Sequence, residues 1–457
     1  MFRLYRPFLL GEDEGDNSRL AGGIKPWVRG RWWYTLTHVC QRWKNIILGA
    51  ASYLELSLVC TYDTHVAEML AHSPPLPLVL DYTRKNRDIT TNDEEGIVLA
   101  LKRRDRVRRL RLKFSTTHLQ KFIAIMAEEY PILECIVIEL PSGDNSTILT
   151  FPETLQAPLL RHLRLIGFAL PIQSRLHTTA VGLVTLSLHM IHPSTYFHPN
   201  TLVQWISLIP QLEMLSVYFK HSIPSRDLVR QLTHTPIIPP ITLPNLRQLR
   251  FHGVSTYLDA FVYRIATPHL EKIQFELFNQ LTFSIPRLQQ FINTIGNFRF
   301  DSVSFSFSDK DVDGVVYLRG GAKYAIGIVV LCWHLDWQVS FLGQVTNSLS
   351  QIFSAVVRIS LRRKEHSRSS EEHNEVDRTE WRNLLRPFRN AKTLRIDNEL
   401  VPDLSRCLQL EDGEPPLGLL PELQELTYSG GGDTDDAFTS FIDARQNAGH
   451  PVTLVRQ

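Results

Sequence analysis

A six-residue pattern of apolar residues recurs along this chain and constrains its fold more than any other feature. Residues 243–251 (LPNLRQLRF) show the pattern, L-x-x-L-x-L, with Leu246, Leu249 and Phe251. The last two apolar residues are two apart, which is the spacing of a β-strand with one buried face. The first lies three residues earlier, where the chain turns into the strand. A single copy would carry little information, so the weight of the pattern comes from its recurrence.

The same pattern occurs at residues 158–165, 209–217, 268–275 and 421–428. Aligned on the final apolar residue, fourteen copies are separated by 22–35 residues, with a mean near 28. This period, with one leucine-patterned strand per unit, is typical of a leucine-rich-repeat solenoid, in which each unit buries its apolar edge against its neighbours. The final residues of the fourteen copies are Leu58, Leu80, Leu112, Ile138, Leu165, Leu188, Val217, Phe251, Phe275, Phe305, Leu331, Leu361, Ile396 and Tyr428.

Several of these strands follow a segment with helical periodicity, in which apolar residues recur at i, i+3, i+4 and i+7. Residues 59–457 are therefore predicted to form an α/β fold, an irregular leucine-rich-repeat solenoid. Its strands would be parallel on the concave face, with right-handed crossovers and helices on the convex face. A polar insertion is expected at about residues 363–378. The periodic helical segments begin at Leu119, Leu202, Leu258, Leu288 and Trp381.

The N-terminal part of the chain does not follow the repeat. Residues 11–30 are rich in glycine and acidic residues, which predicts a flexible loop. Apolar residues then recur at three- and four-residue steps, which predicts one amphipathic helix that ends at Gly49. The apolar residues of this helix are Trp33, Leu36, Val39, Cys40, Trp43, Ile46 and Ile47.

Residues 36–43 (LTHVCQRW), followed by Ile46, Ile47 and residues 52–54 (SYL), resemble an F-box-like domain. An F-box that leads directly into leucine-rich repeats is an architecture of fungal F-box-like families. The resemblance implies an all-α F-box-like segment over residues 1–58. The family's opening Leu-Pro-x-Glu is absent, residues 1–7 resemble the tail of the first helix, and Glu55 stands where the family has tryptophan. We therefore interpret the segment as N-terminally incomplete.

The resemblance implies a non-enzymatic substrate receptor of a Skp–cullin–F-box ubiquitin ligase. The helical segment would bind the Skp adaptor of the cullin–RING ligase, and the repeats would hold a protein substrate. The alternative is a leucine-rich-repeat interaction scaffold that does not engage the ligase, with the same helix packed on the first repeat as a cap. The adaptor-binding residues implied by the resemblance are Leu36, Val39, Cys40, Trp43 and Ile47.

Outward-facing residues of the predicted strands should align from repeat to repeat into columns on the concave face. Guanidinium groups bind carboxylates and phosphates bidentately, so a column of arginines suits an acidic or phosphorylated partner segment. The alternative is that these residues only solvate the sheet. The predicted partner-binding residues are Arg111, Arg164, His189, Tyr218, Arg250, His252 and Arg395.

Three other constellations have a structural and a functional interpretation. Residues 102–113 (KRRDRVRRLRLK) fit either a nuclear-import or phosphate-contacting patch or, as we favour, a strand with one basic face. Residues 309–314 (DKDVDG) match the start of a calcium loop, but the twelfth position is Gly320 instead of glutamate, which favours a turn. Trp333 and Trp337 are predicted to belong to the core and its rim and not to a ligand cage.

Composition places few further limits on function. Net charge is +2 and five cysteines show no C-x-x-C spacing, which points to a reducing compartment, cytoplasmic or nuclear, and not to nucleic acid or membrane. Seventeen histidines form no H-E-x-x-H motif, and the sequence holds no G-x-S-x-G or phosphate-binding glycine loop. We therefore predict no enzymatic activity and no cofactor.

Overall fold

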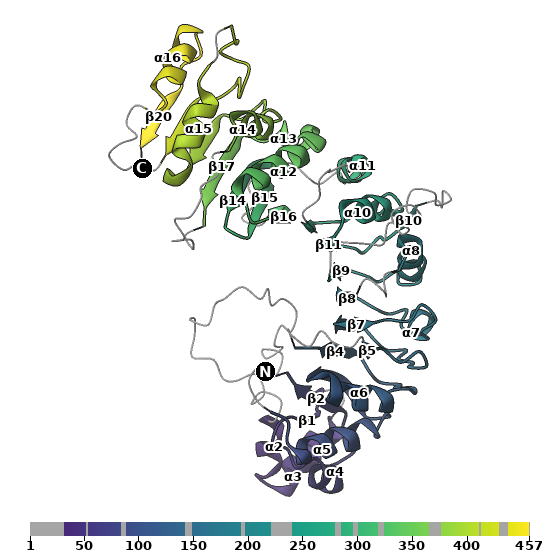
Figure 1. Cartoon of the computed structure of the whole chain (residues 1–457). Coiled ribbons are helices and arrows are strands. Elements are labelled where there is room, and N and C mark those ends of the chain that lie inside the picture. The colour runs from purple at the N-terminus through teal and green to yellow at the C-terminus, as the bar shows by residue number, and fades with distance from the viewer. Residues whose placement is uncertain are drawn as a thin grey trace.

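A single long sheet organises the molecule. The computed structural model describes residues 32–51, 54–83, 88–141, 149–192, 197–220, 240–278, 285–295, 300–318, 324–364, 376–410, 413–428 and 437–456. Within these ranges, a 16-stranded sheet lines the inner side of an arc and helices cover the outer side (Figure 1). The chain is thus a mixed α/β protein built on a large, mainly parallel sheet.

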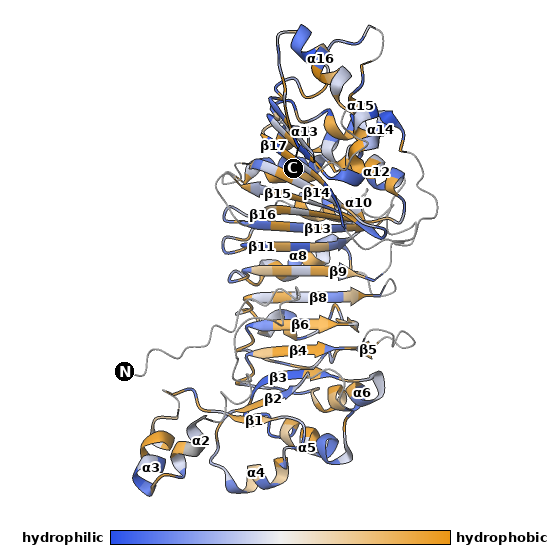
Figure 2. Ribbon diagram, turned by 90° about the vertical axis from the view of Figure 1, so that its left-hand side faces the viewer, coloured by the Kyte–Doolittle hydropathy of each residue, from blue (hydrophilic) through white to orange (hydrophobic). Residues whose placement is uncertain are grey.

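The order of strands in the sheet follows the sequence except at one place. Each parallel neighbour is joined to the next by a helix or loop on the convex side, as a parallel connection requires. Viewed from the concave side, the strands are stacked one above another (Figure 2). In spatial order they are β1 (Leu58–Cys60), β2 (Leu78–Tyr82), β3 (Val107–Lys113), β4 (Cys135–Glu139), β6 (His162–Ile166), β8 (Thr185–Ile191), β9 (Met214–Phe219), β11 (Gln248–Gly253), β13 (Lys272–Phe278), β16 (Tyr324–Leu331), β15 (Asp311–Leu318), β14 (Phe300–Phe307), β17 (Arg358–Arg363), β18 (Thr393–Ile396), β19 (Glu425–Tyr428) and β20 (Thr453–Arg456).

Two short parallel pairs lie outside this sheet: β5 (Leu149–Thr150) with β7 (Phe168–Ala169), and β10 (Ile241–Thr242) with β12 (Ile265–Ala266). The helices carry their apolar stripes toward the sheet; in α8, for example, Leu202, Trp205 and Ile206 are buried. All five segments with predicted helical periodicity contain a helix. The helices are α2 (Trp32–Thr37), α3 (Gln41–Gly49), α4 (Val66–His72), α5 (Thr91–Leu101), α6 (Thr116–Ile125), α7 (Leu176–Thr179), α8 (Pro199–Ser207), α10 (Ser255–Val262), α11 (Pro286–Thr294), α12 (Leu335–Ser348), α13 (Ser350–Phe353), α14 (Arg378–Leu385), the 3₁₀ turn η2 (Asn398–Leu400), α15 (Val401–Leu408) and α16 (Thr439–Asn447).

The predicted register is confirmed over most of the sheet. Leu112, Ile138, Leu165, Leu188, Val217, Phe251 and Phe275 are directly paired from strand to strand. Phe305, Leu361, Ile396 and Tyr428 form a second such series. Because all of these side chains are buried, each repeat contributes one residue to the same continuous layer of the core.

Three of the fourteen final residues are out of register. Leu58 pairs with Leu78, so Cys60 is the partner of Leu80. Leu80 in turn pairs with Leu110, which lies two residues before Leu112 and on the same buried face of β3. In the middle of the sheet Ile328, and not Leu331, is the partner of Phe275. The first two shifts were possible because a strand can slide by two residues without moving its buried face. Ile328 and Leu331 are three residues apart and lie on opposite faces of β16, so Ile328 is buried and Leu331 is exposed.

The prediction that all strands are parallel is wrong for β15. This strand runs antiparallel to both β14 and β16, and the three strands form a meander. The meander also reverses the order of strands, because β13 pairs with β16 and β14 pairs with β17. Both β14 and β16 keep the direction of the other strands, so the sheet continues through the meander without a gap.

The prediction of one helix from Trp33 to Ile47 is also wrong. The chain forms two helices, α2 and α3, and Cys40 between them has extended backbone with φ −163°. Trp33 and Ile47 join the same hydrophobic core as Leu56 and the first strand, so the two helices pack on the end of the sheet. The predicted loop at residues 11–30, residues 1–7 and most of the insertion at 363–378 lie outside the described residues. None of the helices in the described part is long and apolar enough to span a bilayer.

Candidate functional site: the concave strand face

The concave face is built from the residues that alternate with the buried positions of each strand. In β6, β8, β9 and β11, the buried pairs are Leu163 with Leu165, Leu186 with Leu188, Leu215 with Val217, and Leu249 with Phe251. The side chains between and beside them therefore point to the opposite side of the sheet, away from the helices. We call these outward positions the central band: His162, Arg164, Thr185, Ser187, His189, Met214, Ser216, Tyr218, Gln248, Arg250 and His252.

The predicted arginine column exists as an in-register row. Arg111, Val137, Arg164, Ser187, Ser216, Arg250 and Gln274 pair in this order from β3 to β13. Arg164 and Arg250 are therefore separated by two strands whose residues in this row are serines. At about 4.8 Å per strand, the two arginine Cα atoms are about 14 Å apart across a floor of small side chains. Arg395 belongs to a separate stretch of the row, paired with Ser360 and Thr427.

An aromatic column runs beside the arginine row. The imidazole of His189 stacks on the ring of Tyr218 at 4.2 Å between centroids, Tyr218 meets His252 edge-on at 5.6 Å, and His252 contacts Phe278 at 4.5 Å. Four consecutive strands, β8, β9, β11 and β13, supply these rings. Three of them were predicted from the alternation. Phe278, the last residue of β13, was not among the predicted residues.

Ion pairs across neighbouring strands neutralise part of the predicted positive charge. Arg111 pairs with Asp81 at 3.3 Å, and Glu139 lies 3.4 Å from Lys113 and 3.6 Å from Arg164. The outward positions of β3, β4, β6, β8, β9 and β11 carry one carboxylate, that of Glu139. The same positions carry five cations: Arg109, Arg111, Lys113, Arg164 and Arg250. This half of the concave face therefore retains an excess of positive charge.

Both histidines of the aromatic column are neutral at physiological pH. Burial lowers the pKa of His189 to about 3, and the positive charges of Arg164, Arg250 and His252 act in the same direction. Burial also lowers the pKa of His252 to about 4. The Nε2 atom of His189 is buried and has no hydrogen-bond partner among the described residues. The column thus presents ring faces and uncharged imidazoles between two guanidinium groups.

The N-terminal helices carry an exposed apolar stripe. Val39, Trp43 and Ile46 are exposed by 63 %, 47 % and 59 %, and Cys40 is exposed too. Two of the residues predicted to bind the adaptor are not exposed: Ile47 is buried and Leu36 is half-buried against the core. Of the five predicted adaptor residues, Val39, Cys40 and Trp43 are therefore accessible to a partner. Ile46, which was not among the five, extends the same surface.

The aspartate-rich segment at residues 309–314 and the basic segment at residues 102–113 both have a structural explanation, but the turn predicted at residues 309–314 is wrong for residues 311–314. Asp311 and Asp313 lie in β15, not in a turn, and both pair with Lys364, which directly follows β17. Gly314 accommodates a ring, because a Cβ there would come within 2.9 Å of Phe305. In the described ranges no group of three or more His, Cys, Asp and Glu side chains could hold a metal ion. In β3, Val107, Leu110 and Leu112 are buried, so the basic residues form one solvated strand face as favoured.

Trp333 and Trp337 are not core residues, contrary to the prediction. They are exposed by 70 % and 54 %: Trp333 lies between the end of β16 at Leu331 and the start of α12 at Leu335, and Trp337 lies in the first turn of α12. Of the five cysteines, Cys40 is exposed and Cys135 is half-buried, whereas Cys60, Cys332 and Cys407 are buried.

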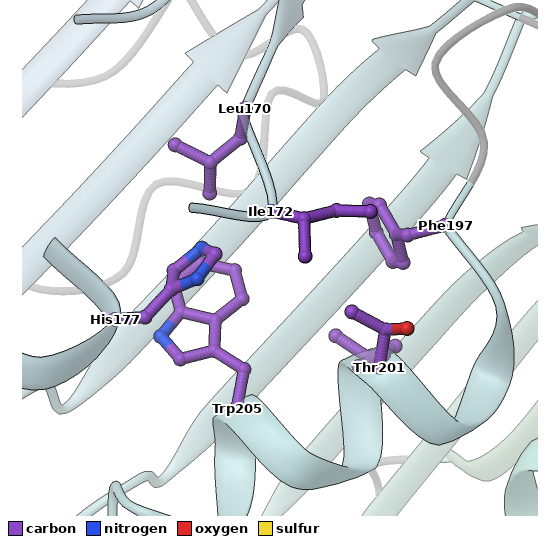
Figure 3. A pocket seen from close by; sticks show the side chains of 7 residues that line it. Leu170, Ile172, His177, Phe197, Thr201 and Trp205 are labelled. Carbon is purple, nitrogen blue, oxygen red and sulfur yellow. The ribbon is translucent and has the colours of Figure 1, made fainter. Parts of the chain in front are cut away.

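A small hollow between α7 and α8 lies on the helical side of the sheet (Figure 3). The ring of His177 lies 4.3 Å from that of Trp205, and burial lowers the pKa of His177. The remaining walls are mostly apolar, and Thr201 adds a hydroxyl group. The residues that line the hollow and are labelled in Figure 3 are Leu170, Ile172, His177, Phe197, Thr201 and Trp205.

Comparisons with known proteins give likenesses among solved structures alone. No protein-family model matches the chain, and no curated protein matches it. Among solved structures, the chain is similar to the leucine-rich repeat-containing protein LegL7 from Legionella pneumophila. The two chains are 13 % identical; the alignment covers 87 % of this chain and 99 % of that one, with a TM-score of 0.26.

Proposed function

We propose that this protein is a non-enzymatic substrate receptor of a Skp–cullin–F-box ubiquitin ligase. Its N-terminal helices would bind the Skp adaptor, and the central band would hold a segment of the protein to be modified. The ubiquitin-transfer chemistry would belong to other subunits, and this chain would contribute proximity between substrate and enzyme. The observation that supports the adaptor contact is the exposed stripe of Val39, Trp43 and Ile46 on a helix pair that is anchored in the core by Trp33 and Ile47.

Exposed aromatic and aliphatic side chains of this kind are what protein interfaces use as anchors, because a partner removes their apolar surface from water. The stripe is not needed to hold the helices in place, since Trp33 and Ile47 fulfil that role. Two adjacent isoleucines thus have opposite environments: Ile46 is exposed by 59 % and Ile47 by 5 %. They provide a matched pair of variants.

The adaptor contact is tested by co-purification of the Skp adaptor with the tagged full chain. Replacing Trp43 and Ile46 together by alanine should leave the thermal unfolding of the chain unchanged and reduce the recovered adaptor about tenfold or more, because two anchors are removed. Trp337→Ala is the control, since this tryptophan is similarly exposed but lies in α12, many strands away from the N-terminal helices. A parent chain that recovers no adaptor would end the ubiquitin-ligase proposal.

The substrate contact is tested at the arginine row. Replacing Arg164 and Arg250 by alanine should leave folding intact, because neither side chain fills the core. Capture of a protein partner should weaken, and the loss should be larger at low salt than at high salt, since screening reduces the contribution of both cations. Arg386 and Arg389 are exposed beside α14 and form the matched double alanine control. If only the control variant loses the partner, the binding surface lies on the helical side.

A second candidate function rests on the burial of Ile47 and the partial burial of Leu36. These residues fit a cap that covers the first repeat, as terminal units of a solenoid require. The chain would then be an interaction scaffold that uses the concave face and does not engage the ligase. In this case the central-band variants would lose their partner, whereas the Trp43 and Ile46 variants would recover all partners normally.

A further inference from the structure

The central band belongs to a half of the concave face with more cations than carboxylates, and the same chain carries a compact acidic run near its N-terminus. Residues 12–16 (EDEGD) hold four carboxylates, Glu12, Asp13, Glu14 and Asp16, and residues 7–18 include no basic residue. Elsewhere in residues 1–31 every charged side chain is an arginine or lysine. The negative charge of this segment is therefore concentrated at one place.

The acidic run is tethered within reach of the central band. The described chain starts at α2, which packs beside β1 at one end of the sheet (Figure 1). From β1, the strand with Arg164 is four strands away and the strand with Arg250 is seven away. At about 4.8 Å per strand, these distances are about 19 Å and 34 Å. Fifteen residues lie between Asp16 and Trp32, and the sixteen Cα–Cα steps from one to the other span at most about 55 Å.

We propose that residues 7–18 of the chain itself occupy the central band, with the carboxylates of Glu12, Asp13, Glu14 and Asp16 bound to Arg164 and Arg250. The segment would act as an internal competitor of the protein partner, so the partner must displace it. This inference rests on the proposed use of the central band as a binding surface, and it does not depend on the Skp adaptor.

The charges favour this occupant over an uncharged segment. Arg164 and Arg250 flank Ser187 and Ser216, and a guanidinium group binds a carboxylate through two parallel hydrogen bonds. His189 and His252 are neutral and add no repulsion to a peptide, while the ring of Tyr218 between them offers an apolar surface. Phe8, Leu9 and Leu10, which precede the acidic run, supply apolar side chains for that surface.

Tethering makes a weak contact effective. A segment joined to its site by a short linker has an effective concentration of about 1 mM there. A segment that binds with a dissociation constant of about 0.1 mM in trans would therefore reduce the apparent affinity of any competitor about tenfold. Because the contact is between ions, the reduction should fall as salt rises.

The test measures fluorescence anisotropy of a labelled synthetic peptide with the sequence of residues 7–18, titrated with full-length protein at low salt. The probe is compared on the parent chain and on a variant that carries Glu12→Gln, Asp13→Asn, Glu14→Gln and Asp16→Asn. We expect the variant to bind the peptide about tenfold more tightly than the parent, because its own segment no longer competes. A peptide with the same four substitutions should bind neither protein.

Adding Arg164→Ala and Arg250→Ala to the charge-neutral variant should abolish peptide binding, whereas Arg386→Ala with Arg389→Ala should leave it unchanged. Thermal unfolding of each variant checks that the fold is kept. Equal affinity of the parent and the charge-neutral variant, or no binding to the latter, overturns the proposal. The proposal is also overturned if the peptide binds about tenfold more tightly only after the four glutamates of residues 365–375 are replaced by glutamine. In that case residues 365–375, and not residues 7–18, would occupy the central band.

The outcomes separate this proposal from the proposed function. Peptide binding that depends on Arg164 and Arg250 can be observed with purified protein alone, so it stands even if no adaptor co-purifies. Conversely, an adaptor that is recovered through Trp43 and Ile46 leaves the ligase role in place even if the peptide does not bind.

Discussion

The imidazole ring of His189 and the phenol ring of Tyr218 are stacked on adjacent strands, with centroids 4.2 Å apart and planes inclined by 32°. This contact starts the aromatic column on the concave face and holds a histidine where water has little access. The energetic consequence appears in the pKa of His189, which burial lowers to about 3. Protonation of this imidazole would place a third positive charge near Arg164 and Arg250.

The stability of the protein should therefore fall as the pH is lowered from 7 toward 4. In the unfolded chain His189 and His252 take up protons near pH 6.5, whereas in the folded chain their pKa values are about 3 and about 4. Below pH 6.5 the unfolded state thus binds more protons, and the free energy of unfolding decreases. Thermal melts at pH 7 and pH 5 should show a lower midpoint at pH 5.

The double variant His189→Phe and His252→Phe isolates this effect. Phenylalanine keeps a ring in the column and cannot be protonated, so the midpoint should change less between pH 7 and pH 5 than in the parent, by about 1 °C for each kcal/mol of lost linkage. Glu276 faces His252 at 3.9 Å, and burial raises its pKa, so it contributes in the opposite direction in both proteins. Parallel pH profiles of the two proteins would contradict the assignment.

Neighbouring residues of one strand should respond oppositely to truncation. Leu163 is completely buried and Arg164 is on the concave face. Leu163→Ala should lower the free energy of unfolding by about 2–5 kcal/mol, because it leaves a cavity between repeats. Arg164→Ala should change it by less than about 1 kcal/mol, since the ion pair with Glu139 is partly exposed. Urea unfolding followed by circular dichroism compares the two; equal losses would mean that the strand faces are misassigned.

Most of the concave face could be predicted because strand alternation is a local property. Once Leu163 and Leu165 are recognised as buried, Arg164 must face the other side, and the same logic holds for Arg250 between Leu249 and Phe251. The ion pairs could not be predicted in this way. Glu139 neutralises part of the charge of Arg164 because the two residues lie close together on the paired strands β4 and β6. This proximity depends on the register between the strands, which is not visible in the sequence of either strand alone.

The errors in the fold have related causes. The alternation within β15 is as regular as in its neighbours, with Val312, Gly314 and Val316 buried, so nothing local reveals that the strand runs antiparallel. Its direction follows from the short connection to β14, since parallel strands need a longer crossover. The break between α2 and α3 was missed because apolar spacing continues across Cys40, and neither glycine nor proline marks the turn there.

Asp93 should be a strong determinant of stability in the first repeats. Its carboxylate accepts hydrogen bonds from the backbone N–H and hydroxyl of Thr90, at 3.1 and 2.6 Å, and from the backbone N–H of Asp63 at 2.9 Å. Asp63 has a positive φ of 61°, so this bond fixes a turn that precedes α4 as well as the start of α5. Asp93→Ala should cost about 2–3 kcal/mol, because the N-terminal cap is lost and buried donors are left unsatisfied.

Denaturant unfolding checks this value, with Glu95→Ala as the control because Glu95 is exposed in the same helix. The control should change the free energy of unfolding by less than about 0.5 kcal/mol. Thr90→Ala, which removes one hydrogen-bonding side chain of the capping box, should give an intermediate loss of about 1 kcal/mol. If Asp93→Ala were no more damaging than Glu95→Ala, the capping interaction would have no energetic role.

Arg445 should hold the last repeat together. Its side chain is completely buried, and its guanidinium donates hydrogen bonds to the carbonyl oxygens of Leu420, Pro421 and Leu423 at 3.0, 2.9 and 3.3 Å. These bonds join α16 to the chain just before β19. Arg445→Ala would leave three carbonyl groups without this donor and open a cavity, at a cost of about 3–5 kcal/mol. Because each repeat is stabilised mainly by its neighbours, the loss should be confined to the C-terminal end.

Hydrogen exchange measured by mass spectrometry should locate this loss. In Arg445→Ala, amides of α16 and β20 should exchange at least about tenfold faster, as expected when the free energy of local opening falls by more than 1.4 kcal/mol. Amides of β8 and β9 should be unaffected, because they lie many repeats away. Gln446→Ala is the control, since Gln446 is exposed next to Arg445 on the same helix and should leave exchange unchanged. Faster exchange throughout the sheet would instead mean that the solenoid unfolds as a single cooperative unit.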